Sequence, residues 1–173
     1  HDPNCRNAIG SCPLISAILP LNTLQEKLAR VLPQVSKPHR YVGEEMNIVR
    51  KDLSQMKVKV ALAFPEVYEL GMSHIGLKIL YHLCNQIPDI AAERVYCPWL
   101  DMEAKMRENQ IPLFTLENKV PVSEFDVVGF SLQSEFTCTN VLTMIDLAGR
   151  ALFARDRKEI FPLFIAGGPC VSN

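Results

Sequence analysis

The sequence lacks clustered cysteines. Its cysteines are scattered through 173 residues, and they form neither a CxxC nor a CxxxCxxC motif. Zinc and iron–sulfur sites need several thiolates close together, so the spacing offers no metal site in this chain. Scattered cysteines are typical of a reducing compartment, which predicts a cytoplasmic protein. The cysteines are Cys5, Cys12, Cys84, Cys97, Cys138 and Cys170.

Glycine-rich phosphate motifs and a strong charge imbalance are missing too. No GxGxxG follows the first apolar run and no GxxxxGK[ST] occurs, which argues against a dinucleotide site of the Rossmann type and against a P-loop. With 18 basic and 19 acidic residues, the net charge of −1 gives no direct signal for nucleic-acid binding. No long stretch is free of both charges and prolines, so we expect no transmembrane helix and no membrane partner.

The two ends of the chain suggest a fragment of a longer protein. It starts at His1 rather than at a methionine, and it stops shortly after a Gly-Gly-Pro turn. Residues 1–22 carry an apolar patch but no periodic pattern, so we expect an extension outside the fold. We expect an N-terminal helix and an irregular segment in residues 23–56, and an α/β domain in residues 57–173.

Short apolar runs alternate with helical patterns along the rest of the chain. Buried strands are expected at 57–64, 126–131 and 163–166, and shorter strands at 94–96 and 111–117. Helices are expected at 24–32, at about 73–85, at 101–110 and at 139–153. This order predicts an α/β fold, with a mainly parallel sheet of the flavodoxin or Rossmann type and helices on both faces. The three buried strands should be neighbours.

Three polar or small-residue loops follow the three buried strands, at 65–74, 131–137 and 167–173. Parallel strands end at one edge of a sheet, where ligands bind, so the loops should share one site. His74 suits a metal ligand or a base, but also a helix cap or a partner of Glu69. Glu66 and Glu69 suit a catalytic pair, or two solvated loop carboxylates. No catalytic residue is assigned. The candidate cofactor-binding residues are Tyr68, Glu69, Gly71, Ser73, His74, Ser131, Gln133, Gly167 and Gly168.

Five blocks in order resemble a known family. They are KPHRYVGEEMN, ALAFPEVYELGMSHIGLKILYHLCNQ, ERVYCPWLDMEAKMRENQIPLFTLE, DVVGFSLQSEFTCTNVLTMIDLAG and PLFIAGGPC. Between residues 24 and 173 the chain resembles the N-terminal cobalamin-binding-like domain of bacterial radical S-adenosylmethionine (radical SAM) proteins. The resemblance implies a cobalamin cofactor on the strand ends, in an enzyme such as a methyltransferase. It also implies a following radical SAM domain, as partner, which holds the [4Fe–4S] cluster and S-adenosylmethionine.

The chain departs from the DxHxxG motif of other cobalamin domains, in which the His replaces the lower axial ligand of cobalt. Met72 and Leu77 stand where that motif has Asp and Gly around His74. The resemblance therefore implies cobalamin binding without the usual support for a ligating histidine. Two alternatives stay open. The chain could be a degenerate docking domain that binds no cofactor, or a flavodoxin-like flavin or nucleotide binder.

Overall fold

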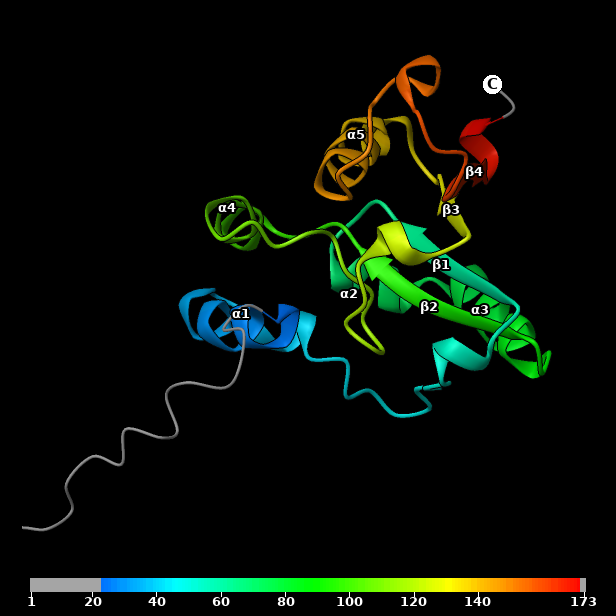
Figure 1. The fold of residues 1–173 in the computed structure, drawn as a ribbon, viewed down its shortest axis with the longest axis horizontal. Coiled ribbons are helices and arrows are strands. Elements are labelled where there is room, and N and C mark those ends of the chain that lie inside the picture. The colour runs from blue at the N-terminus through cyan, green and yellow to red at the C-terminus, as the bar shows by residue number, and fades with distance from the viewer. Residues whose placement is uncertain (1–22, 172–173) are drawn as a thin grey trace, which may run out of the picture.

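The fold is a four-stranded, all-parallel sheet with helices between the strands, of the Rossmann or flavodoxin type (Figure 1). The computed structural model describes residues 23–171. The prediction for residues 1–22 lies outside this range. The strand order is β2-β1-β3-β4, with strands β1 (Val58–Phe64), β2 (Ile90–Tyr96), β3 (Val127–Ser131) and β4 (Leu163–Gly167). The three strands predicted to be neighbours, β1, β3 and β4, are neighbours.

Helices cover the two faces of the sheet unequally. Strand β1 alternates, so that Ala61 and Ala63 face one core and Leu62 and Phe64 face the other. The first core contains buried side chains of α1 (Leu24–Val31), α4 (Leu100–Glu108) and α5 (Cys138–Leu147). The second is formed with α3 (Ile75–Gln86), which contacts mainly β2. Right-handed crossovers explain why the helices lie on different faces. The connection from β1 to β2 crosses the sheet in one direction, and the connections from β2 to β3 and from β3 to β4 cross it in the other, so their helices lie on opposite faces.

Several local signals in the sequence set the helix ends. Thr23 caps α1 in a capping box with Glu26, as expected for an N-cap residue. The helix expected at about 73–85 is confirmed as α3, and His74 caps its start with its own side chain. A short helix α2 (Tyr68–Ser73) lies before it, within the segment expected to be a loop. The helix expected at 139–153 ends at Leu147, and Gly149 has a positive φ of 69° just beyond it.

The strand predicted at 111–117 is wrong. This segment joins the sheet neither as a strand nor through a ladder, and its nearest regular feature is a single antiparallel bridge between Phe114 and Pro121. It runs along the outer edge of β2, where the Leu116 amide donates to the Arg94 carbonyl at 2.8 Å. The side chain of Asn85 binds the Ala92 amide and carbonyl, and that of Glu117 binds the Arg94 amide, so no continuous ladder forms there. The strand expected at 94–96 is longer and starts at Ile90.

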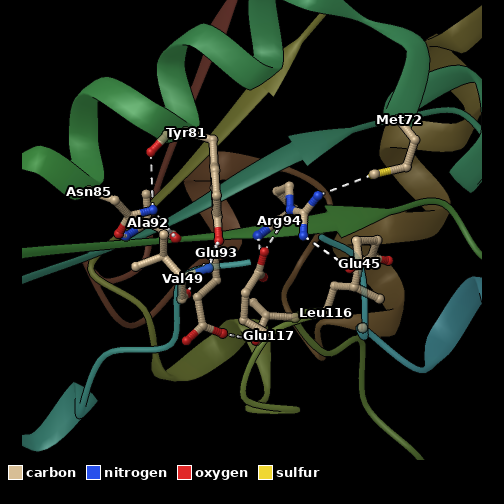
Figure 2. A network of polar contacts seen from close by, with 12 residues as sticks. Glu45, Val49, Met72, Tyr81, Asn85, Ala92, Glu93, Arg94, Leu116 and Glu117 are labelled. Carbon is tan, nitrogen blue, oxygen red and sulfur yellow. Dashed lines mark hydrogen bonds and ion pairs between the residues drawn. The ribbon is translucent and has the colours of Figure 1, made fainter. Parts of the chain in front are cut away.

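A buried ion pair joins that segment to the edge of the sheet (Figure 2). Arg94 Nε donates to Glu117 Oε1 at 2.6 Å, and the Arg94 amide donates to Glu117 Oε2 at 2.7 Å. The same guanidinium reaches Glu45 at 3.2 Å and lies over the ring of Tyr81. Although burial alone would lower the pKa of Arg94, Glu117 outweighs it and raises that pKa above its ordinary value.

Strand β4 pairs as predicted, but the expectation that it is buried is wrong. Leu163 is 44% exposed and Ile165 is 56% exposed. Its other residues are also open to solvent, except the half-buried Phe164, which packs against the core of α5. A parallel strand is normally covered on both faces, so β4 is the strand of this sheet that the described residues cover least.

We expect Arg94→Leu to lower the free energy of unfolding by about 3–5 kcal/mol, because it leaves the buried Glu117 carboxylate without its cation. Arg107 is the matched control, since it also binds two carboxylates but its side chain is 47% exposed. Arg107→Ala should cost less than about 1 kcal/mol. Urea unfolding of both variants measures the difference. Equal losses would mean that the buried pair has no special weight.

Candidate functional site

The carboxyl ends of all four strands lie at one edge of the sheet, because every pair is parallel. Phe64 is paired in register with Tyr96 on β2, and Ser131 with Gly167 on β4. Ser131 follows directly after Phe130, which is in register with Ala63. The ends of the strands thus form a row in the order Tyr96, Phe64, Ser131, Gly167. The candidate residues lie in this row or in the loops that follow it.

Tyr68 and Glu69 begin α2, and each is bound to the irregular segment before β1. The Tyr68 hydroxyl donates to Glu45 Oε1 at 2.8 Å. Burial, and then this carboxylate, raises the pKa of Tyr68 to about 12, so the phenol stays protonated. Glu69 accepts from Arg40 Nε and Nη2 at 3.0 and 2.9 Å, and it also pairs with Lys37. Partial burial raises the pKa of Glu69, but these hydrogen bonds outweigh it and hold that pKa below its usual range.

Gly71 is buried against the ring of Tyr96. A Cβ atom added there would lie 2.2 Å from Tyr96 Cε1, so the close approach of α2 to β2 requires glycine. The ring of Tyr96 is held in turn by Tyr68, with ring centroids 5.7 Å apart and nearly perpendicular planes. The space that Gly71 leaves is therefore filled by protein.

Ser73 and His74 complete the turn from α2 to α3. The Ser73 hydroxyl donates to the Leu70 carbonyl, and His74 Nδ1 accepts from the Leu77 amide at 3.1 Å. The His74 ring packs on Phe64, with centroids 5.0 Å apart. Of the roles considered for His74, the structure therefore shows the helix cap, while Glu69 binds Arg40 and Lys37 instead.

The remaining candidates gather at the ends of β3 and β4. The Gly167 carbonyl accepts from the Leu132 amide at 2.7 Å, which joins the two loops. Gly168 has a φ of 112°, and a Cβ atom there would lie 2.3 Å from the Leu132 carbonyl oxygen. A Cβ atom on Gly167 would meet no atom within 4 Å. Ser131 is half-buried beside Gly167, and Gln133 is exposed in the loop beyond it.

The candidates thus form two groups with His74 between them. Tyr68 and Gly71 contact Tyr96 at the β2 side, with Glu69 beside them on α2, and Ser131, Gly167 and Gly168 lie at the β4 side. Within residues 23–171 no side-chain hydrogen bond or ion pair joins the two groups. Glu69, considered above as one of a catalytic pair with Glu66 or as a solvated loop carboxylate, forms ion pairs with Arg40 and Lys37.

A pocket at the same edge escaped the sequence reasoning. Its volume is about 230 Å³, and it lies between the ends of β1 and β2 and the helices α4 and α5. Asn140 of α5 closes one side, where its Nδ2 donates to the Pro65 carbonyl at 2.9 Å. The segment Cys97-Pro98-Trp99 directly follows β2, and this position at a strand end was the signal available in the sequence. The polar and aromatic lining comes mainly from Glu66, Cys97, Trp99, Glu103, Asn140 and Thr143.

The chain matches a family model described as radical SAM proteins, N-terminal, over residues 76–173. The chain belongs to this family. The match begins at the start of α3 and runs through β2, β3 and β4, so three of the four strands lie inside it. No curated protein and no solved structure matches the chain significantly. The domain is therefore the N-terminal domain of a radical SAM protein.

The family implies a [4Fe–4S] cluster and S-adenosylmethionine in the full-length protein, and the cluster needs clustered thiolates. Among residues 23–171, no three His, Cys, Asp or Glu side chains are close enough together to hold a metal ion. The cysteines in this range are all free thiols. In the same part of the chain, no helix is both long and apolar enough to cross a membrane.

The thiol of Cys97 should be unreactive although it lines the pocket. Burial, followed by the nearby Glu103 and Glu66 carboxylates, raises its pKa to about 12, so very little thiolate exists at pH 8. Cys138 is exposed and serves as the control. We expect iodoacetamide at pH 8 to alkylate Cys138 first and Cys97 only after denaturation, as measured by peptide mass spectrometry. Rapid labelling of native Cys97 would show that the pocket stabilises a thiolate.

Proposed function

We propose that this N-terminal domain holds cobalamin for a radical SAM enzyme, with the corrin on the carboxyl ends of β3 and β4. The observation that carries the proposal is the open shelf formed by the registered pair Ser131 and Gly167. No protein atom lies within 4 Å of the position that a Gly167 side chain would take. A broad, flat cofactor needs such a surface without projecting side chains, together with polar groups at its rim. Ser131 and Gln133 offer those polar groups.

His74 is not arranged as an axial ligand in this proposal. A backbone amide can only donate, so the Leu77 amide requires a lone pair on His74 Nδ1. In the neutral ring, the proton then lies on Nε2, which leaves that nitrogen without a free lone pair for cobalt. In DxHxxG domains an aspartate supports the ligating histidine, and here Met72 stands at that position. The protein would hold the corrin through its edge rather than through cobalt.

The residues at the edge of the sheet would bind the corrin in different ways. Ser131 and Gln133 would donate hydrogen bonds to the amide side chains of the corrin, and Gly167 would let the ring approach the sheet. Gly168 keeps the β4 loop folded back on Leu132. A bound cobalamin supplies a cobalt centre that can carry a methyl group. Cleavage of S-adenosylmethionine belongs to the radical SAM domain.

Gly167→Leu tests the shelf directly. The space above Gly167 is empty and its φ is not positive, so leucine should be tolerated by the fold and should block the corrin. Gly168→Leu is unsuitable, because its strained φ and its contact with Leu132 would disturb the loop itself. We expect Gly167→Leu to abolish the absorbance change when the full-length protein is titrated with hydroxocobalamin. His74→Ala should weaken binding only modestly.

Ala166→Leu is the matched control. Ala166 is adjacent to Gly167 on β4 and is also exposed, but strand alternation places its side chain on the other face. It should bind cobalamin as the unchanged protein does. Loss of binding in His74→Ala with full binding in Gly167→Leu would contradict the proposal. A flavin spectrum after titration with FMN would favour the flavodoxin-like alternative, and no spectral change with either cofactor would favour a docking domain.

A further inference from the structure

The α3 side of the sheet is covered over β1 and β2 but open over β3 and β4. Val128 and Phe130 face the α5 core, so the alternate residues Val127, Gly129 and Ser131 face the α3 side. The register places Leu163 beside Val127 and Ile165 beside Gly129 on that same face. Both β4 side chains are largely exposed. The floor of this region is thus apolar and low, with glycine at its centre.

One flank of α3 forms the wall of the region. Leu77, Tyr81 and Cys84 make the row that packs on the sheet. Asn85 lies on one side of this row and hydrogen-bonds to the Ala92 amide and carbonyl at the outer edge of β2. At 3.6 residues per turn, Leu80 lies on the other side of the row, toward β3 and β4. Leu80 is exposed, and we call the space between it and β4 the α3–β4 groove.

Standard packing distances give the α3–β4 groove the width of one helix. Neighbouring strands are about 4.8 Å apart, so the midline of β3 and β4 lies about 10 Å from the midline of β1 and β2 on the α3 side. Packed helices have axes about 8–10 Å apart. A second helix beside α3 would therefore lie over β3 and β4 and would bury Leu80, Leu163 and Ile165.

The handedness of the fold limits the source of such a helix. A right-handed crossover from β4 to a strand beyond it would run over the opposite face, where α5 lies. A helix in the α3–β4 groove must then come after the last strand of the sheet or from another domain. The chain is the N-terminal domain of a radical SAM protein, so the same polypeptide provides a following part. The family and the sheet topology are the same whether or not the domain binds cobalamin.

We propose that the α3–β4 groove binds an amphipathic helix from the part of the radical SAM protein that follows residue 173. The helix packs alongside α3 with its apolar face on Gly129, Leu163 and Ile165. It covers the open side of the sheet and fixes the N-terminal domain to the rest of the enzyme. Parallel sheets are buried on both faces in folded proteins, and this helix supplies the missing cover.

Photo-crosslinking in the full-length radical SAM protein identifies the occupant. Leu80 and Ile79 are 46% and 52% exposed on α3. They lie about 100° apart around the helix, so Leu80 is on the groove side and Ile79 points away from the sheet. p-Benzoylphenylalanine is introduced separately at Leu80, at Ile165 and at Ile79, and cross-linked peptides are mapped by mass spectrometry. Because all three positions are exposed, the replacements should leave the fold intact.

We expect Leu80 and Ile165 to cross-link to one and the same segment C-terminal to residue 173 within the chain, and Ile79 to give no such cross-link. A cross-link from Leu80 or Ile165 to a second copy of the chain would overturn the proposal. So would a cross-link to residues 1–22, or equal yields at Leu80 and Ile79. A melting curve of each variant, unchanged from that of the parent protein, excludes misfolding as the cause of a missing cross-link.

Discussion

The position of the Arg94 guanidinium decides the structure of one whole side of the molecule. Arg94 is on the edge strand β2, where its backbone groups would otherwise lack partners. Its side chain binds Glu117 and Glu45, and it lies over Tyr81. One buried cation therefore holds together the segment after α4, the segment before β1, and the helix α3. A buried ion pair of this kind contributes little net stability compared with an apolar pair, but the loss of either partner is costly.

The candidate site inherits its geometry from this network. Glu45 binds both Arg94 and Tyr68, so the start of α2 is placed by a contact that begins on β2. Tyr96 is two residues further along the same strand, and its ring fills the space left by Gly71. The β2 end of the carboxyl edge is thus closed by protein side chains. At the β4 end no comparable network exists among the described residues, and the surface over Gly167 stays open.

Patterns of apolar residues predicted the sheet well, because buried parallel strands need continuous apolar runs and these occur at β1, β3 and β4. The same reasoning failed at 111–117. That run is buried, but it contains Thr115 and Glu117, whose side chains bond to Glu93 and Arg94 instead of leaving the backbone to form a ladder. A local sequence pattern does not contain the partner, which lies more than 20 residues away. Burial of β4 was wrongly expected for a related reason. Its apolar residues favour a buried position, but they do not show which part of the protein covers them, and Leu163 and Ile165 are exposed.

For the candidate site, the sequence identified which loops lie at the same edge of the sheet. It did not show that their residues form two separate groups, one at the β2 side and one at the β4 side. Topology alone brings the loops after β1, β3 and β4 together, and strand order is predictable from handedness and connection length. Gly71 makes room for the ring of Tyr96, and His74 caps the start of α3. Each role depends on one tertiary or local contact, which the spacing of residues in the sequence does not predict. The pocket beside Cys97 and Asn140 depends on where tertiary packing places α5 relative to the end of β1, a position that the sequence pattern does not give.

The open shelf and the α3–β4 groove share one strand, and this links the two features physically. Gly167 is part of the shelf. Ile165, two residues earlier on the same face of β4, lies on the floor of the groove. Strand β4 is an edge strand held on one side only by β3. A helix packed on Leu163 and Ile165 would restrict the motion of β4, and the Leu132–Gly167 hydrogen bond would carry that restraint into the shelf. Any ligand on the shelf would then bind to an edge whose rigidity depends on the rest of the radical SAM protein being in place.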